Sequence, residues 1–486
     1  MSENPYYLVA SVEVGNTTTK CILTETDLRT GYTDVIEKHV SETSKVRSPK
    51  TNEKIIGHNI TGLSFSREAL SELVSEVVLN CFEKAGKNVE DVHYVARSSG
   101  IVSQSSKTDA ADEIIRALAD GCFLAGISPS KMSGVLSADA LPENISPFSK
   151  LSYVYFDGAV AGSSLPKWQG GSVVPNEMEG ELACAGLKEA ARHKHVDFRN
   201  PCVVIDMGTT LSGRILSKGN PYAGTLGNFC GYSGAIADFI VKDLINIDEY
   251  NDDKYNYDKY KNDPLCASNV FMHYKKPSFF KELKIRKDLK KATDSVNELL
   301  YVGKATPESK YAGPFEINPK KAEEYGVNIY VCDFYDSASV ATLGSIGFDF
   351  YKKHGISGLS ILVDEVMTDI VVRLLKSVSL DYDLSDFKIG ITGRAAISGN
   401  KQNILLKKLS KKSNKSNKSK KSKKSNGKTF SISSDRIVFT DDGLARGAAV
   451  MARCIHSLGS PKNPIGGNTG DSCILLKRKK LQNNNK

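Results

Sequence analysis

Several features of membrane-spanning and secreted proteins are missing from this sequence of 486 residues. No apolar run approaches the ~20 residues that a membrane-spanning helix needs. The first residues, MSENPYYLVASVEVG, lack the basic and apolar regions of a secretory signal. Cysteine is sparse, and none of the ten cysteines forms a Cys-x-x-Cys pair. These absences predict reduced thiols and a cytoplasmic protein with no membrane association.

The positive charge of the sequence is concentrated in two segments. The formal net charge is +9, but residues 407–428 hold 11 Lys and no acid, and the last ten residues add five more basic side chains. The rest of the chain is therefore mildly acidic. A Lys/Ser/Asn run cannot offset the ordering entropy of a packed loop, so we expect 407–428 to be a solvated insertion and 461–486 a loose tail. Lysines attract phosphates, but no aromatic residue is interleaved for base stacking, which argues against a nucleic-acid partner.

Apolar strands alternate with amphipathic helices along most of the chain, which predicts an α/β protein. The expected strands cover residues 6–13, 17–23, 92–96, 153–156, 202–207, 388–392 and 434–440. The expected helices cover residues 66–85, 109–125, 177–191, 234–245, 362–378 and 443–456. A Tyr/Asp/Lys/Asn-rich stretch at 248–263 has the composition of a surface insertion.

Two glycine turns that follow expected strands carry a repeated pattern. Gly15 lies in VEVGNTTTK and Gly208 lies in VIDMGTT, and an acid precedes each glycine by two residues, Glu13 and Asp206. Glycine allows close approach of the backbone to a phosphate, and successive amides there form an anion-binding nest. Hydroxyl groups can donate to phosphate oxygens, and a carboxylate can hold Mg²⁺ through its waters.

Each turn taken singly is also an ordinary hairpin signal, and only the duplication favours the phosphate interpretation. Two such hairpins facing one another would grip a polyphosphate from both sides. The candidate phosphate-binding residues are Gly15, Asn16, Thr17, Thr18, Thr19, Lys20, Gly208, Thr209 and Thr210. Glu13 and Asp206 are the candidate Mg²⁺ residues.

The paired turns, with a third glycine turn downstream, resemble the actin/sugar-kinase/Hsp70 ATPase superfamily. In this resemblance, Gly390, Gly393 and Arg394 match the adenosine-binding turn. The segment DGLARGAAVMA, residues 442–452, matches the connecting helix, whose small residues allow a close helix crossing; an Ala-rich core helix is the alternative. The resemblance implies two ribonuclease-H-like lobes around an interdomain cleft that holds ATP and Mg²⁺.

We expect the first lobe to span 6–195, completed by a connecting helix within 441–458. The second lobe would span 200–440, with insertions at 248–330 and 407–428. Asp206 is the expected residue for orienting an attacking water. Glu179 is a weaker candidate, for which a solvated helix charge is the favoured interpretation. The superfamily usually has Asp where this chain has Glu13, so the resemblance favours nucleotide binding over hydrolysis.

Two segments resemble the ATPases that activate 2-hydroxyacyl-CoA dehydratases and benzoyl-CoA reductase. They are TTTKCI at 17–22 and NFCGYSG at 228–234. In those activators the matching Cys helps to bind a [4Fe-4S] cluster at a dimer interface, which implies an iron–sulfur ligand at Cys230 in a homodimer. Cys332 is a poor counterpart, so a small buried thiol is the favoured interpretation of Cys230.

Most of the chain resembles the methanogenesis marker 14 family of methanogenic archaea. The matching segments include VASVEVGNTTTKCILT, NEMEGELACAG, DFRNPCVVIDMGTTLSGRI and NPIGG. The resemblance implies a cytoplasmic protein of methane-forming metabolism. By analogy with the activators, ATP-driven lobe motion would activate a partner metalloenzyme or corrinoid protein. The alternatives are a small-molecule kinase with Asp206 as base, and a nucleotide-sensing scaffold without turnover.

Overall fold

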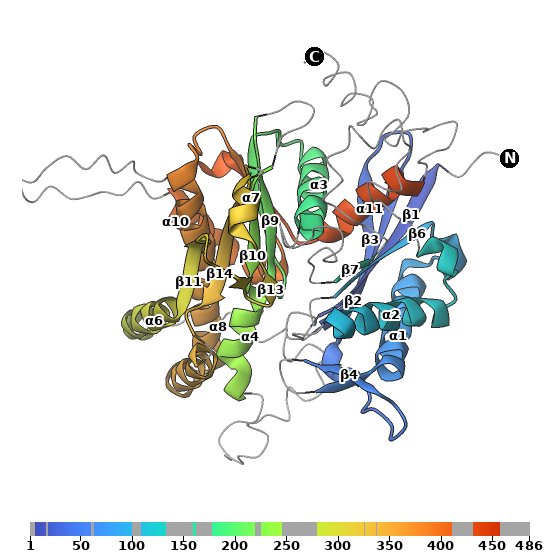
Figure 1. Ribbon diagram of the computed structural model, residues 1–486, viewed down its shortest axis with the longest axis horizontal. Helices are drawn as coiled ribbons and strands as arrows, with labels where there is room; N and C mark the ends of the chain where they lie inside the picture. Colours follow the sequence, from blue (N-terminus) through green and yellow to red (C-terminus); the bar gives the residue numbers. More distant parts are fainter. Residues whose placement is uncertain are drawn as a thin grey trace, which may run out of the picture.

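The computed structural model describes residues 5–15, 18–59, 63–99, 108–132, 159–161, 177–218, 225–244, 279–324, 326–336, 338–410 and 431–456. Within these ranges the chain forms two large sheets, each with helices on its faces, as the sequence predicts for an α/β protein (Figure 1). None of the helices in the described ranges has the length and hydropathy to cross a bilayer.

The first sheet has five strands in the order β3-β2-β1-β6-β7. The strands are β1 (Tyr6–Val14), β2 (Thr18–Asp27), β3 (Thr33–Glu42), β6 (Tyr94–Ser99) and β7 (Ala159–Ala161). β1, β2 and β3 form an antiparallel meander, whereas β6 runs parallel to β1, and β7 to β6. Helices α1 (Arg67–Ala85) and α2 (Thr108–Leu124) cover one face, and their apolar residues share a core with alternate residues of β1 and β2.

The second sheet has seven strands in the order β11-β14-β10-β9-β8-β15-β16. The strands are β8 (Cys202–Met207), β9 (Leu211–Leu216), β10 (Thr225–Gly231), β11 (Leu300–Lys304), β14 (Asn328–Phe334), β15 (Lys388–Thr392) and β16 (Ile437–Thr440). β8, β9 and β10 again form an antiparallel meander, with β15 parallel to β8, and β16 to β15. Five strands of this sheet therefore repeat the order and directions of the first sheet.

Helices and short ribbons surround the second sheet and flank the first. The helices are α4 (Gly234–Val241), α6 (Phe279–Leu299), α7 (Pro319–Glu324), α8 (Ser339–Asp381), α9 (Arg394–Ile397) and α10 (Lys401–Ser410). Two-stranded ribbons pair β4 (Ile55–His58) with β5 (Ser64–Ser66), and β12 (Tyr311–Ala312) with β13 (Phe315–Glu316). Residues of α4, α6 and α8 form one core with the second sheet.

Two helices, α3 (Glu177–His193) and α11 (Gly443–His456), lie between the sheets (Figure 1). The Ala183 face of α3 packs on β8, and the Ala448 face of α11 packs on β1 and β6. The helices cross backbone to backbone, because a Cβ on Gly186 would collide with the carbonyl oxygen of Gly443, and one on Gly447 with that of Leu182. The close crossing expected for the connecting helix is therefore confirmed.

Polar contacts join the first sheet to the start of α11. Lys38 on β3 pairs with Asp441 at 3.3 Å and with Asp442 at 3.1 Å. Arg446 on α11 donates to the carbonyl oxygen of Thr33 at 2.5 Å. These contacts fix the direction in which α11 leaves the second sheet and crosses to the first.

Helix ends follow the sequence closely where capping residues mark them. Ser66 accepts a hydrogen bond from the Ala69 amide at 3.1 Å, and Gly86 ends α1 in the left-handed conformation. α8 is longer than the predicted 362–378, because it continues on the N-terminal side of a non-helical residue, Gly355. Many residues on that side are exposed, so the apolar stripe that defined the prediction is interrupted there.

The predicted insertions need correction. The span 248–330 was expected to lie outside the lobe, but α6 and β11 lie within it, and β14 begins before it ends. The apolar periodicity of the sequence did not indicate these elements, because α6 has many charged residues and β11 is short. Lys407 and Lys408 belong to α10, where Lys408 pairs with Asp369 at 2.6 Å. The expected strand at 153–156, the stretch 248–263, the rest of the lysine run from 411 to 428 and the tail 461–486 lie outside the described residues.

The backbone contact between α3 and α11 generates a stability prediction. Gly→Ala at an unobstructed helix position stabilises a protein by up to ~1 kcal/mol. We expect Gly186→Ala instead to lower the free energy of unfolding by about 1–3 kcal/mol, because the added methyl forces the helices apart. Urea unfolding followed by circular dichroism measures the change, and equal or greater stability of the variant would contradict the crossing.

Candidate functional site

Three carboxylates from different elements converge between the sheets. Glu13 lies on β1, Glu179 in the first turn of α3, and Asp206 on β8. Val12 and Val14 point into the core under α1 and α2, so alternation turns Glu13 to the opposite face, toward α3 and α11. The charges of Glu13 and Asp206 both raise the pKa of Glu179, so the three groups lie within electrostatic reach of one another. All three were predicted from the sequence as site residues.

Glu179 is buried, with 7% of its surface exposed. Burial is the main cause that raises the pKa of its carboxyl to about 8, and the charges of Asp206 and Glu13 add to it. The interpretation of Glu179 that the sequence favoured, a solvated helix charge, is therefore wrong. At neutral pH its carboxyl holds a proton and can donate a hydrogen bond.

Asp206 is equally enclosed, with 3% of its surface exposed. Burial, followed by the charge of Glu13, raises the pKa of Asp206 to about 7, while Lys20 and a hydrogen bond act in the opposite direction. The hydrogen bond comes from the hydroxyl of Ser212 on β9, at 3.3 Å. Ser212 is not among the predicted site residues, but its place directly across the β8–β9 hairpin from Asp206 is a signal that could have identified it.

Glu13 is paired with a cation on the neighbouring strand. The Lys20 ammonium lies 2.8 Å from the Glu13 carboxylate, and the two residues are register partners across the β1–β2 hairpin. Lys20 was expected to contact a phosphate, and Glu13 to contact Mg²⁺. Here each neutralises the other, so a ligand that uses either group must compete with this ion pair.

Part of the first glycine turn is directed away from the carboxylates. The Gly15 amide donates to the Thr18 carbonyl at 2.9 Å, which closes the turn; Asn16 and Thr17 lie outside the described residues. Thr19 is fully buried, and its hydroxyl bonds to that of Thr43 at 3.1 Å. The prediction that Thr19 binds phosphate is therefore wrong, because strand alternation points it into the core with Cys21. Thr18 lies on the opposite face and is half-buried.

The second glycine turn is held firmly but leaves space above Gly208. The Gly208 carbonyl accepts hydrogen bonds from the Gly234 amide and the Ser233 hydroxyl, both at 2.8 Å. The Thr209 carbonyl accepts from the Ala235 amide at 3.0 Å, and Thr210 forms a bridge with Tyr232. A Cβ on Gly208 would meet only the Thr210 carbonyl oxygen, at 3.8 Å. A methyl-sized group therefore fits at Gly208 without a clash.

The third glycine turn has a packing role in addition to its place beside the second. Gly393 has φ = 87° and lies against the backbone of Met207, so β15 delivers Gly393 and Arg394 to the end of β8. Gly390 does not belong to this surface. A Cβ there would meet Leu187 and Phe198, both at 2.8 Å, so its lack of a side chain allows α3 to pack on the sheet. The assignment of Gly390 to an adenosine site is corrected accordingly.

Cys230 does not fit an iron–sulfur cluster. Its side chain is fully buried in an apolar cluster with Phe315 and Val331, and burial raises the pKa of its thiol far above the ordinary value. Cys332, on the adjacent strand, belongs to the core on the other face of the sheet. The two thiols therefore point to opposite faces and cannot bind one cluster. Within the described residues, no group of three or more His, Cys, Asp or Glu side chains is arranged to hold a metal ion directly.

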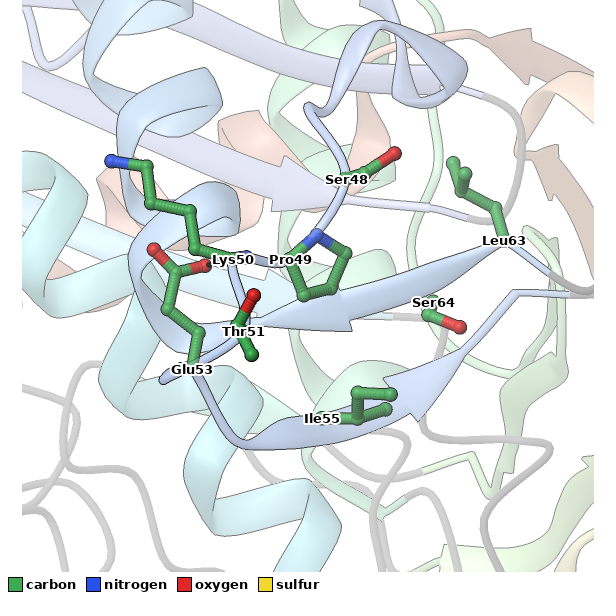
Figure 2. Close-up of a pocket in the computed structure, with 8 residues that line it drawn as sticks. All are labelled: Ser48, Pro49, Lys50, Thr51, Glu53, Ile55, Leu63 and Ser64. Atoms are coloured by element: carbon green, nitrogen blue, oxygen red, sulfur yellow. Dashed lines mark hydrogen bonds between the residues drawn. The ribbon is translucent and has the colours of Figure 1, made fainter.

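One hollow of the described surface lies away from the carboxylates. It is an open pocket of about 510 Å³ between the loop at Ser48 to Thr51 and the β4–β5 ribbon. Its lining residues are labelled in Figure 2. It contains no predicted site residue, and its carboxylate, Glu53, is already bound by Arg47 at 2.8 Å. Beside Glu179 there is a hollow of only about 10 Å³, lined by Ser11, Ser98 and Leu444 among others. That volume is close to the minimum for one water molecule.

Comparisons with known proteins identify relatives over nearly the whole chain. A family model described as "Uncharacterized protein conserved in archaea (DUF2114)" matches residues 6–482. An uncharacterized protein of Methanocaldococcus jannaschii is 38% identical over 99% of this chain and 92% of its own length. One of Methanothermobacter thermautotrophicus is 36% identical over 99% of this chain and 84% of its own length. Both organisms are methanogens.

A solved structure, described as a structural study of the Aquifex aeolicus PPX-GPPA enzyme, aligns only partially. It covers 46% of this chain and 52% of its own, with 11% identity and a TM-score of 0.25. The chain thus spans about half the length of that protein.

The burial of Glu179 generates a prediction for stability against pH. The folded protein binds the Glu179 proton up to about pH 8, whereas the unfolded chain releases it near the ordinary value of 4.5. Between these limits the native state binds more protons, so stability falls as pH rises, by up to ~1.4 kcal/mol per pH unit. Glu179→Gln replaces the titrating carboxyl with a neutral amide. The free energy of unfolding of this variant should therefore decline less than that of the wild type over this pH range.

Urea unfolding at several pH values between about 5 and 8 measures the difference. Glu68→Gln, at an exposed position of α1, is the matched control and should follow the wild type. Parallel pH profiles for wild type and Glu179→Gln would show that Glu179 is solvated in the folded protein.

Proposed function

This chain belongs to the archaeal DUF2114 family, and we propose that it binds ATP with Mg²⁺ between two ribonuclease-H-like lobes. The convergence of Glu13, Glu179 and Asp206 from both sheets on the helix between them carries the proposal. It is supported by the repeated strand order of the two sheets, in which β1 and β8 occupy equivalent central positions. Each of these strands ends at a glycine turn preceded by one of the acids.

The half-buried Gly208, where an added Cβ would meet no clash, supports this turn as a contact for a phosphate group. Gly393 and Arg394 lie beside it, which suits a nucleoside or its phosphates at the end of β8 and β15. On the first sheet, the turn at Gly15 and the half-buried Thr18 are the groups that would contact the polyphosphate. Lys20 would contribute positive charge once released from Glu13.

The donor set suits a hydrated Mg²⁺ ion. Carboxylate oxygens are the ligands that this ion prefers, and the three acids have only Lys20 as a described counter-charge. Asp206 and Glu13 would hold the ion through water molecules. When bound, the ion would neutralise charge on the phosphate oxygens.

Asp206 is the residue best suited to act as a base. With a pKa of about 7, a large fraction of the Asp206 carboxyl group is deprotonated at neutral pH, and the carboxylate is still basic enough to accept a proton from water. The hydrogen bond from Ser212 orients this carboxylate. Glu179, which is protonated at neutral pH, can donate a hydrogen bond toward an oxygen that gains negative charge.

The proposed role is nucleotide-driven motion of the lobes. α3 and α11 connect the sheets through a glycine contact, so a change in lobe angle would be transmitted through this crossing. The relatives in two methanogens support a role in methanogenesis, as the methanogenesis marker 14 resemblance implies. We propose that a metalloenzyme or corrinoid protein senses this motion.

Two alternatives have support of their own. The basicity of Asp206 would equally suit a kinase that deprotonates a substrate hydroxyl. The ion pair between Glu13 and Lys20 favours a scaffold that binds nucleotide without hydrolysis, because it withholds Glu13 from the ion.

Calorimetric titration with ATP and Mg²⁺, combined with phosphate release, tests the proposal. We expect the wild type to bind ATP and release phosphate without an added acceptor. Asp206→Asn should retain nucleotide affinity and lose phosphate release by about 10²-fold or more, because the base is removed. Asp349→Asn, on the exposed surface of α8, is the control and should match the wild type.

The outcomes separate the alternatives. Turnover that requires a metabolite acceptor would identify a kinase, and tight binding without turnover a scaffold. A wild type with no measurable affinity for ATP would overturn the nucleotide site altogether.

A further inference from the structure

A buried ion pair closes the segment that follows the third glycine turn. Lys401, the first residue of α10, places its ammonium 2.6 Å from the carboxylate of Asp364 on α8. Their side chains keep only 2% and 7% of their surface exposed. Helices α8, α9 and α10 each contribute apolar residues to the core around the second sheet. Two charges in such a place need further polar partners, because burial disfavours the charged form of each.

The polar partners of this pair lie in the loop between α9 and α10. The Asp364 carboxylate accepts a hydrogen bond from the Asn400 amide at 2.9 Å. The Lys401 ammonium donates to the carbonyl and hydroxyl oxygens of Ser398, both at 3.2 Å. Gly399 has φ = 63°, and a Cβ there would lie 2.9 Å from both carboxylate oxygens of Asp364. The loop is therefore shaped around this carboxylate.

The same loop holds the backbone of Arg394. The Ser398 hydroxyl donates to the Arg394 carbonyl oxygen at 2.6 Å, and the Ser398 amide donates to it at 3.1 Å. Because α9 is a single turn, these two hydrogen bonds close it. The other end of α9 is set by Gly393, which lies against the backbone at the end of β8. The buried ion pair is thus linked through Ser398 to Arg394.

The pair is better suited to fixing an orientation than to raising stability. Replacing a buried ion pair with apolar residues of similar volume is often neutral or stabilising, whereas removing one partner leaves an uncompensated charge. For stability alone, an apolar pair would fill this space at least as well. Apolar side chains cannot supply the hydrogen bonds that hold the loop and, through it, α9.

We propose that Asp364 and Lys401 are positioning residues, which orient α9 so that Arg394 contacts the nucleotide. This inference rests on the proposed nucleotide site. Arg394 is half-buried, and within the described residues its guanidinium has no hydrogen-bond or ion-pair partner, so it is available to an anionic ligand. Asp364 and Lys401 are enclosed in the protein and act on the ligand only through the turn.

The double variant Asp364→Leu/Lys401→Met separates positioning from stability. It removes both charges together, so its melting temperature should stay close to that of the wild type. Its KM for ATP in phosphate release should rise about tenfold, while kcat changes by about twofold or less, because Arg394 loses its orientation. Lys304→Met, at a more exposed pair with Asp381, is the matched control and should leave KM unchanged.

A double-mutant cycle tests whether the pair acts through Arg394. Arg394→Gln alone should raise KM by about as much as the double variant does. Adding Arg394→Gln to the double variant should raise KM little further, because both changes remove the same contact. An additive increase, or an unchanged KM in a stably folded double variant, would overturn the proposal.

Hydrogen exchange of the nucleotide-free protein provides a readout that does not depend on ATP. In the double variant, the amides of Ala396 and Ser398, which donate within this turn, should exchange about tenfold faster, while the amides of α8 keep their wild-type protection. Should the double variant fail to fold, Ser398→Ala removes the linking hydroxyl alone and should give the same local increase.

The exchange data distinguish failure of this inference from failure of the nucleotide site. Unchanged exchange in α9 would overturn the positioning role, whatever the result with ATP. Faster exchange in α9 of a protein whose wild type binds no ATP would support the orienting role of the ion pair and overturn the nucleotide site alone.

Discussion

The contact between α3 and α11 is the constraint on which the rest of the structure depends. Gly186 and Gly447 let the two helix backbones touch, so both helices fit between the sheets. α3 can then pack its Ala183 face on β8 while its first turn reaches β1 and β6. A side chain at the crossing would separate the sheets and move Glu179 away from both Glu13 and Asp206. Lys38 and Arg446 hold α11 to the first sheet from its other side.

Among the described residues, the site formed in this way is short of positive charge. Burial and mutual repulsion raise the pKa of Glu179 and Asp206, and Lys20 is shared with Glu13. Such an arrangement is costly in an isolated fold, because buried carboxylates are disfavoured in their charged form. Perturbed acids of this kind cluster at functional sites, where a ligand or a reaction makes use of them. The firm anchoring of the neighbouring Gly208 turn by α4 keeps one side of the site fixed.

Much of the local structure could be predicted from short patterns. β15 and α11 have the bounds that their apolar periodicity indicates, and Ser66 and Gly86 mark the ends of α1. The periodicity failed where elements are charged or short, as in α6 and β11, because neither displays an apolar stripe of sufficient length. The prediction that Thr19 and Gly390 belong to a binding site was wrong for another reason. Their chemistry suited a ligand, but strand alternation and the approach of α3 place them in the interior.

The sequence by itself determined the alternation of strands and helices and the repeated acid-x-Gly pattern, since both depend on residues close together in the chain. Only the tertiary structure decided which distant groups meet. It brought Glu179 to the two acids and Ser212 to Asp206, and it turned Cys230 and Cys332 to opposite faces of one sheet. The physical reason is that local pattern fixes which face a side chain occupies within its element. The packing of one element on another, set here by helix crossing and strand register, fixes what that face meets.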